Sequence, residues 1–133
     1  MNATRRFFRV IALAALAALP ACGSEIGPAT SGTATVSFVT PNSDDGAVLV
    51  SLIGPGVRDA QPASFAYKAY WRVVSANELR LLVVGNLADG VVATVTVDDI
   101  NKLGQYHATV LEVASRADVV RASTAGYSFT LTR

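Results

Sequence analysis

The sequence predicts an all-β fold, an antiparallel β-sandwich of about seven to eight strands that follows a cleaved N-terminal signal helix. From residue 33 onward, apolar and polar residues alternate with a period of two, which is typical of strands that bury one face. Turn-forming residues recur at intervals of about 8–15 residues, and residues 33–133 contain no long helical period. This pattern is typical of an antiparallel sandwich or barrel, and of the two we expect the sandwich.

Seven segments carry the strand pattern. The first alternates cleanly, which predicts that Ala34, Val36 and Phe38 enter the core. The second is apolar almost throughout, which predicts a central strand covered on both sides. The predicted strands are residues 33–40, 47–53, 64–75, 78–84, 91–97, 106–114 and 127–132.

The connections are predicted from their turn residues. Residues 86–90 end in Asp-Gly, which is a hairpin signal. Residues 57–63 are predicted to be a polar connection, and residues 98–104 a loop with at most one helical turn. Residues 115–126 leave three possibilities open: a loop, a short helix or an edge strand.

The first 22 residues have the features of an export signal. Three arginines precede an apolar run, residues 10–19, and small residues follow it. The run is too short to cross a bilayer, which needs about 20 apolar residues. Pro20 also interrupts any helix at the end of the run. We therefore expect the segment to be removed rather than to stay as a transmembrane anchor.

The end of the run, Leu19-Pro20-Ala21-Cys22, resembles the lipobox of bacterial lipoproteins, in which an aliphatic residue and two mostly small residues precede a cysteine. Leu19, Ala21 and Cys22 fit this pattern, whereas Pro20 is a less usual occupant of its position. The resemblance implies cleavage between Ala21 and Cys22, a diacylglycerol on the Cys22 thiol and an acylated amino terminus. Two or more acyl chains hold a protein firmly on a membrane. The alternative is an ordinary signal peptide with a chance cysteine.

The same resemblance implies where the protein resides. The segment 4–8 also resembles a twin-arginine export motif, although paired arginines occur in ordinary signals too. No aspartate follows Cys22, so the sorting habit of the family favours the outer membrane or its periplasmic face in a cell with two membranes. We expect an exported protein, lipid-anchored to the cell envelope. Residues 1–21 would be the signal peptide, 22–32 a lipidated flexible tether and 33–133 the sandwich domain.

Composition excludes several functions. Removing 21 residues from the 133-residue chain leaves 112, which suits one domain with a modest core. Three of the eleven Lys and Arg residues lie in the signal, so eight remain against ten acidic residues. The mature charge near −2 lacks the basic footprint of a nucleic-acid-binding protein. Cys22 is the single cysteine, which excludes disulfides, thiol catalysis and cysteine-ligated zinc in the domain. We expect no cofactor.

His107 is the single histidine and therefore the one candidate base for a nucleophilic triad. A triad also needs a serine nucleophile and an orienting acid, and the sequence has no Gly-x-Ser-x-Gly elbow. His107 alternates with Tyr106 and Ala108 inside a predicted strand, which favours a structural or exposed position. We expect a protein that is not an enzyme, with a small hydrolase as the least favoured alternative.

Two loops are rich in carboxylates, Asp98-Asp99-x-Asn101 and the segment 42–45. Calcium binds six to eight oxygen ligands, so the two loops could form a site together if they lay at one end of the sandwich. Neither loop has the spacing of an EF-hand, and Asp, Asn and Gly also form turns for backbone reasons alone. We expect no metal site and name Asp98, Asp99 and Asn101 as the candidates.

The segment 67–72 carries three aromatic and two basic residues. Exposed aromatic rings on a sheet can stack on sugar rings. Strand alternation, however, places most of the local aromatic residues on the core-facing side and points Tyr70 the other way, between Lys68 and Arg72. The residues of core parity are Phe65, Tyr67, Trp71 and Val73. The candidate ligand-binding residues are Tyr70, Trp71 and Arg72.

The later half of the chain resembles, in pattern only, the closing strands of cohesin-like sandwiches, which are bacterial surface interaction modules. The similar features are the strand 91–97, a loop, another strand and a Gly-initiated strand, residues 126–131. The resemblance implies a binding role. We expect a non-catalytic domain that contacts an envelope protein through a sheet face or its end loops. The main alternative is a glycan- or peptidoglycan-binding module that uses Tyr70 and its basic neighbours.

Overall fold

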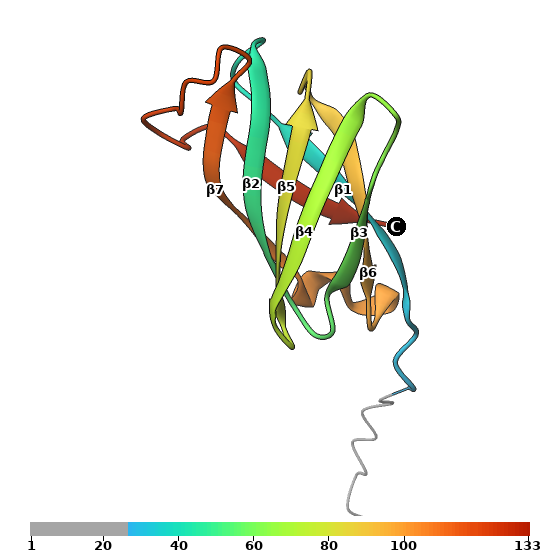
Figure 1. The fold of residues 1–133 in the computed structure, drawn as a ribbon. Helices are drawn as coiled ribbons and strands as arrows, with labels where there is room; N and C mark the ends of the chain where they lie inside the picture. Colours follow the sequence, from blue (N-terminus) through green and yellow to red (C-terminus); the bar gives the residue numbers. More distant parts are fainter. Residues whose placement is uncertain (1–26) are drawn as a thin grey trace, which may run out of the picture.

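The computed structural model describes residues 27–133, which form two four-stranded antiparallel sheets packed face to face (Figure 1). One sheet has the strand order β3-β6-β1-β8 and the other β4-β5-β2-β7. The predicted antiparallel sandwich is confirmed, with eight strands. The elements are β1 (Gly32–Val39), β2 (Asp45–Ile53), β3 (Arg58–Pro62), β4 (Tyr67–Ser75), β5 (Glu78–Gly85), β6 (Gly90–Val97), the 3₁₀ helix η1 (Ile100–Gln105), β7 (His107–Ser115) and β8 (Ser128–Thr132).

The core lies between the two sheets and follows the predicted alternation. Every second residue of β1, β2 and β5 points inward, because side chains alternate between the faces of a strand. Phe38 is fully buried, with its ring centroid 4.9 Å from Phe129 and 5.9 Å from Tyr127. The fully buried inward residues of these three strands are Ala34, Val36, Phe38, Val48, Val50, Leu79, Leu81 and Val83, and Leu52 is 1% exposed.

The segment 47–53 is central, as predicted, but it is covered on one side only. It forms most of β2, which pairs with β5 on one edge and with β7 on the other. Leu49 is half-buried and Ile53 is exposed, because no third layer covers the outer face of this sheet. An apolar run therefore marked a central position in the sheet, not burial of both faces.

The polar connection predicted over residues 57–63 is wrong, because residues 58–62 form β3 at the edge of a sheet. An edge strand tolerates Pro62 and polar side chains that a central strand would not. Of its five residues only Ala60 is buried. The next predicted strand begins later than expected, at Tyr67, because residues 63–66 form a turn in which the Tyr67 amide donates to the Ser64 carbonyl at 3.2 Å.

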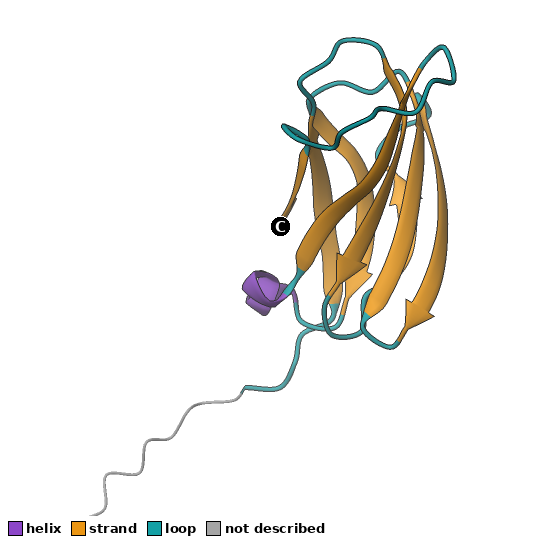
Figure 2. Ribbon diagram, turned by 90° about the vertical axis from the view of Figure 1, so that its left-hand side faces the viewer, coloured by secondary structure: helices purple, strands orange, loops and turns teal. Residues whose placement is uncertain are grey.

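Of the stretch 115–126, for which three possibilities were open, Ser115 ends β7 and residues 116–126 form a loop. Its one bridge to the sheet pairs Ala114 with Val120. It lies at the end of the sandwich opposite η1 and the entry of the chain (Figure 2). Residues 98–104 contain most of η1, which runs to Gln105 and is longer than the single helical turn that was predicted.

The chain enters the domain beside η1. The Ile100 amide donates to the Thr30 carbonyl at 2.8 Å, and the Ser31 hydroxyl donates to the Val97 carbonyl at 3.1 Å. The last residues of the predicted tether are therefore fixed to the domain. The predicted signal, its cleavage site and Cys22 lie outside the described residues. Between residues 27 and 133, no helix is long and apolar enough to cross a membrane.

Candidate functional site

Strand β4 is the most exposed strand of the sandwich. It lies at the edge of its sheet, and seven of its nine residues are exposed. Tyr70 is 57% exposed, and Trp71, Val73 and Val74 are each exposed by 43–45%. Four large apolar side chains therefore face solvent from one strand, on both of its sides.

The expectation that the aromatic residues of core parity are buried is wrong for Trp71 and Phe65. Trp71 does lie opposite the buried Leu81 of β5, so its parity is as predicted. It is nevertheless exposed because β4 is the last strand of its sheet and, within residues 27–133, has no neighbour on its other side. Phe65 lies in the turn before β4 and is fully exposed. Tyr67, by contrast, packs half-buried against the core.

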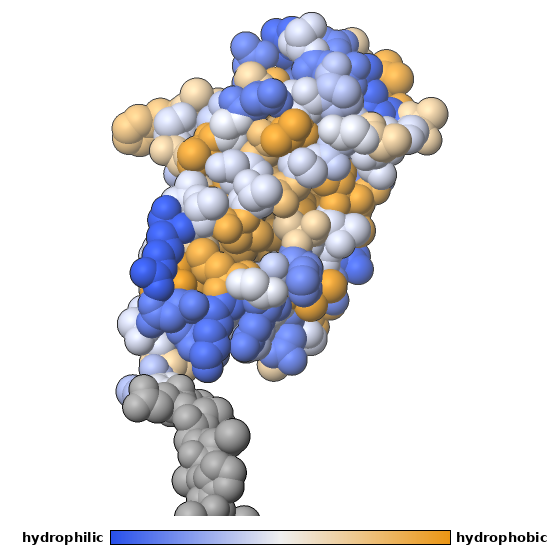
Figure 3. Space-filling view, turned by 180° about the vertical axis from the view of Figure 1, so that it is seen from behind, coloured by the Kyte–Doolittle hydropathy of each residue, from blue (hydrophilic) through white to orange (hydrophobic). Residues whose placement is uncertain are grey.

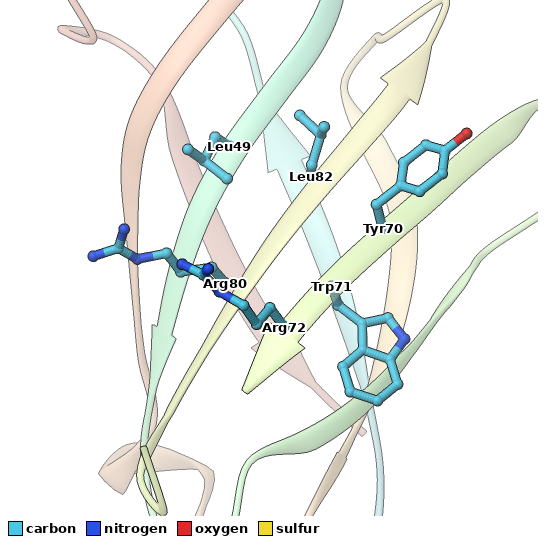
Figure 4. Close-up of a pocket in the computed structure, with 6 residues that line it drawn as sticks. All are labelled: Leu49, Tyr70, Trp71, Arg72, Arg80 and Leu82. Atoms are coloured by element: carbon cyan, nitrogen blue, oxygen red, sulfur yellow. The ribbon is translucent and has the colours of Figure 1, made fainter. Parts of the chain in front are cut away.

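A shallow hollow of about 300 Å³ lies on the outer face of β4, β5 and β2 (Figure 4). Tyr70 of β4 lies opposite Leu82 of β5, which in turn lies opposite Leu49 of β2. These three side chains form an apolar row across three strands. The residues that line the hollow are Leu49, Tyr70, Trp71, Arg72, Arg80 and Leu82.

The neighbouring row is basic. Arg72 of β4 lies directly opposite Arg80 of β5, and like charges in such a cross-strand pair repel each other. Glu78 is the acid beside them: its Oε1 accepts from the Ser51 hydroxyl at 2.8 Å and lies 3.5 Å from Arg80 Nε. Among residues 27–133, no carboxylate lies within 4.0 Å of the Arg72 guanidinium or of the Lys68 ammonium. The hollow therefore has a positive charge excess beside an apolar floor.

The structure brings two of the three predicted site residues to one face. Tyr70 and Arg72 both border the hollow, whereas the Trp71 ring points to the other side of β4 (Figure 4). Sequence reasoning missed Arg80, Leu82 and Leu49 as lining residues. The alternation in β5 already placed Arg80 and Leu82 on its outer face, but only the strand order places them next to Tyr70 and Arg72.

The outer face of the other sheet differs in character (Figure 3). There, pale and hydrophobic residues are mixed over most of the surface, and the hydrophilic residues gather toward the two ends. Thr35 lies between Thr94 and Thr132 in one cross-strand row, and Ser37 lies opposite Thr130 in another. This arrangement has neither the aromatic exposure nor the paired arginines of the β4 side.

The two carboxylate-rich loops lie at opposite ends of the sandwich. The segment 98–101 follows β6 beside the entry of the chain, since Val97 pairs with Gly32 at the start of β1. The segment 42–45 joins β1 to β2 at the other end. The possibility that the two loops combine into one calcium site is therefore ruled out by the fold.

The polar groups of the segment 98–101 bind neighbouring protein groups. Asp98 forms an ion pair with Arg58, and Asn101 accepts from Arg133. Asp99 Oδ1 accepts from the Asn101 amide at 3.0 Å and so caps η1. Within the described part of the chain, no group of three or more His, Cys, Asp or Glu side chains is placed to hold a metal ion.

Asp45, in the other loop, is fully buried and holds the far end of the sandwich together. Its Oδ1 accepts from Arg121 Nη2 at 2.8 Å, from Arg121 Nε at 3.0 Å and from the Tyr127 hydroxyl at 3.1 Å, and its Oδ2 accepts from Thr40. Burial alone would raise the pKa of Asp45, but the hydrogen bonds from Thr40, Arg121 and Tyr127 outweigh it and hold the pKa below the ordinary value of 3.8. The hydrogen bonds of Arg121 to Asp45 and Asp44 raise the pKa of the arginine. The cluster ties the loop 116–126 to the start of β2.

His107 lies exposed at the start of β7, with its Cα opposite that of Ile53. In the described residues, no hydrogen bond joins its imidazole to a serine or to an acid. A Ser-His-Asp arrangement is therefore not brought together around His107.

Comparisons with known proteins found no relative of this chain. No protein family, no curated protein and no solved structure matches it significantly. The resemblance of the later strands to cohesin-like modules stays a prediction.

We expect Asp45→Asn to lower the free energy of unfolding near neutral pH by about 1–3 kcal/mol, because the amide cannot replace the charged acceptor. The folded pKa of Asp45 is depressed, so its contribution is fully present above the unfolded value near 3.8 and is lost as the pH falls through the folded pKa. Urea unfolding at several pH values from about 7 to about 3 measures both effects.

In that series, the stability of Asp45→Asn should fall less on acidification than that of the wild type. The matched control is Asp44→Asn, which removes an exposed partner of the same arginine and should keep most of the acid dependence. An unchanged acid dependence in Asp45→Asn would show that Asp45 does not carry this stabilisation.

Proposed function

We propose that this protein is a lipid-anchored lipoprotein of the bacterial cell envelope, and that its sandwich domain is a non-catalytic module that binds an envelope protein. The proposed contact surface comprises β4 and the hollow beside it. One observation carries this proposal: β4 exposes Tyr70, Trp71, Val73 and Val74 to solvent together. Large apolar side chains that are exposed together on one edge strand, on both of its sides, are typical of interaction sites.

The chemistry of the surface supports a protein partner. Tyr, Trp and Arg dominate the binding energy of protein interfaces because they combine a large contact area with directed polar groups. Tyr70, Trp71 and Arg72 are consecutive on β4, and Arg80 lies beside them. The apolar floor with basic neighbours is suited to an apolar patch that carries acidic groups.

The position of the surface also supports an anchored module. The chain enters beside η1, and the turn with Phe65 and the loop with Val119 lie at the far end of the sandwich (Figures 1 and 2). An anchor at Cys22 would hold the entry side toward the membrane. The far end and the side of β4 would then be free to contact a partner.

A glycan-binding module is the second candidate. The exposure of both Tyr70 and Trp71 favours it, since the interpretation would fail if both rings were buried. Tyr70 lies between Lys68 and Arg72 on the outer face, which suits an acidic sugar. The two rings point to opposite sides of β4, however, so they form no common platform (Figure 4).

Site-specific photo-crosslinking in intact cells tests the contact surface. A photoreactive side chain is placed at Val74 on β4 or, as the matched control, at Thr94 on the opposite sheet. We expect a discrete protein adduct from position 74 that is absent from position 94. Equal adducts from both positions, or polysaccharide in place of protein at position 74, would contradict the proposal, and the latter would favour the glycan-binding alternative.

The anchor is tested by Cys22→Ser, which removes the thiol that would receive the diacylglycerol. We expect this variant to accumulate as a precursor that keeps residues 1–21 and carries no lipid. Intact-mass spectrometry of the membrane fraction measures both features. Ser24→Ala is the control and should be processed normally. Processing of Cys22→Ser between Ala21 and position 22 would contradict the lipoprotein assignment.

A further inference from the structure

The free edge of β4 is the least protected strand edge of the domain. β4 pairs with β5 alone, so its other edge has no neighbouring strand. Within residues 27–133, β4 makes one backbone hydrogen bond outside this pairing. It lies at the first residue of the strand, where the Tyr67 amide donates to the Ser64 carbonyl. From Lys68 to Val74, the edge presents unpaired N–H and C=O groups, which are a template for another strand.

Of the three other sheet edges, two belong to shorter strands and the third is covered at one end. β3 and β8 have five residues each, and β3 ends with Pro62, which has no N–H to donate. The end of β7 is covered by its own loop, because the Arg121 amide donates to the Val113 carbonyl at 2.8 Å and Val120 bridges to Ala114. β4 has nine residues and no proline, and no loop of the described chain is hydrogen-bonded to its free edge from Lys68 to Val74.

The charges on β4 select what can pair with it. Lys68 and Arg72 are four residues apart on the outer face, and no carboxylate of residues 27–133 is paired with either of them. Arg80 adds a second guanidinium directly behind Arg72. In an added strand, the residues opposite Lys68 and Arg72 would lie on the same face, about 4.8 Å away. Opposite charges at these two positions attract, and like charges repel.

We propose that β4 accepts an extended segment of a partner protein as a fifth strand, and that this segment carries acidic residues four positions apart, opposite Lys68 and Arg72. Apolar residues of the segment would lie opposite Ala69 and Trp71, on the other side of the added strand. The proposal rests on the proposed function and names the chemistry of the partner. The five residues of the segment opposite residues 68–72 would therefore be acidic, apolar, of any type, apolar and acidic.

A second copy of β4 fits this edge less well. In antiparallel self-pairing centred on Tyr70, Lys68 of each copy would lie opposite Arg72 of the other. An acidic segment meets both basic positions with opposite charge in the same register. Charge complementarity therefore favours a different protein over a dimer of this chain.

The test uses the full-length protein in detergent and a fluorescent peptide with the central run Glu-Val-Thr-Val-Glu. Fluorescence anisotropy measures its affinity and that of a peptide with Lys in place of both Glu residues. Arg72→Glu should weaken binding of the acidic peptide by about tenfold or more and strengthen binding of the basic one. Thr94→Glu, on the opposite sheet, is the matched control and should change neither affinity.

Two further peptides separate strand addition from charge attraction alone. N-methylation of alternate amides blocks the hydrogen bonds of one edge of a strand, so one methylated parity should lose binding and the other should keep it. Three results would each overturn the proposal. The two methylated peptides could bind equally well, Arg72→Glu could fail to shift binding from the acidic to the basic peptide, or the chain could form a concentration-dependent dimer through β4. If the peptide does not bind but the protein adduct from position 74 still forms, strand addition fails and the proposed function stands; if neither occurs, both fail.

Discussion

The position of β4 at the edge of its sheet decides which part of this molecule faces solvent. In a sandwich, each strand buries one face against the opposite sheet, and β4 has nine residues where the facing edge strand β3 has five. Trp71 and Val73 have the parity of core residues, but they are exposed because β4 has a neighbouring strand on one side only. Tyr67 and Ala69, nearer the turn from β3, are half-buried, whereas the later residues of β4 are exposed on both sides of the strand.

The distribution of charge reinforces this asymmetry. Most carboxylates of the described chain lie in the end loops, where they pair internally: Asp98 with Arg58, and Asp45 with Arg121. These ion pairs stabilise the two ends of the sandwich and neutralise the charges of the paired side chains. The outer face of β4 and β5, in contrast, keeps Lys68 and Arg72 without acidic partners among residues 27–133. Of the four basic side chains that lack a carboxylate partner among residues 27–133, two, Lys68 and Arg72, therefore lie beside the exposed aromatic residues.

The residue pattern of each segment was sufficient to predict the parts of the fold that depend on neighbouring residues in the sequence. Alternation predicted the inward residues of β1 and β5, and Asp-Gly predicted the turn before β6. It failed for β3, because edge strands have no apolar face strong enough to show in the sequence. It also failed for Trp71, because parity states which way a side chain points, not whether another strand lies there. Strand order is set by long-range pairing, so the neighbourhood of Tyr70 and Arg72 with Arg80 and Leu49 required the structure.

The most direct measurement is hydrogen exchange of the β4 backbone amides in the full-length protein, with and without envelope membranes from the same cells. If β4 is the contact surface, exchange from Lys68 to Val74 should slow when membranes with the partner are present, while the edge of β8 should be unaffected. Slowed exchange shows that these amides become hydrogen-bonded or shielded. Unchanged exchange along β4, with slowing at another edge or loop, would contradict the account.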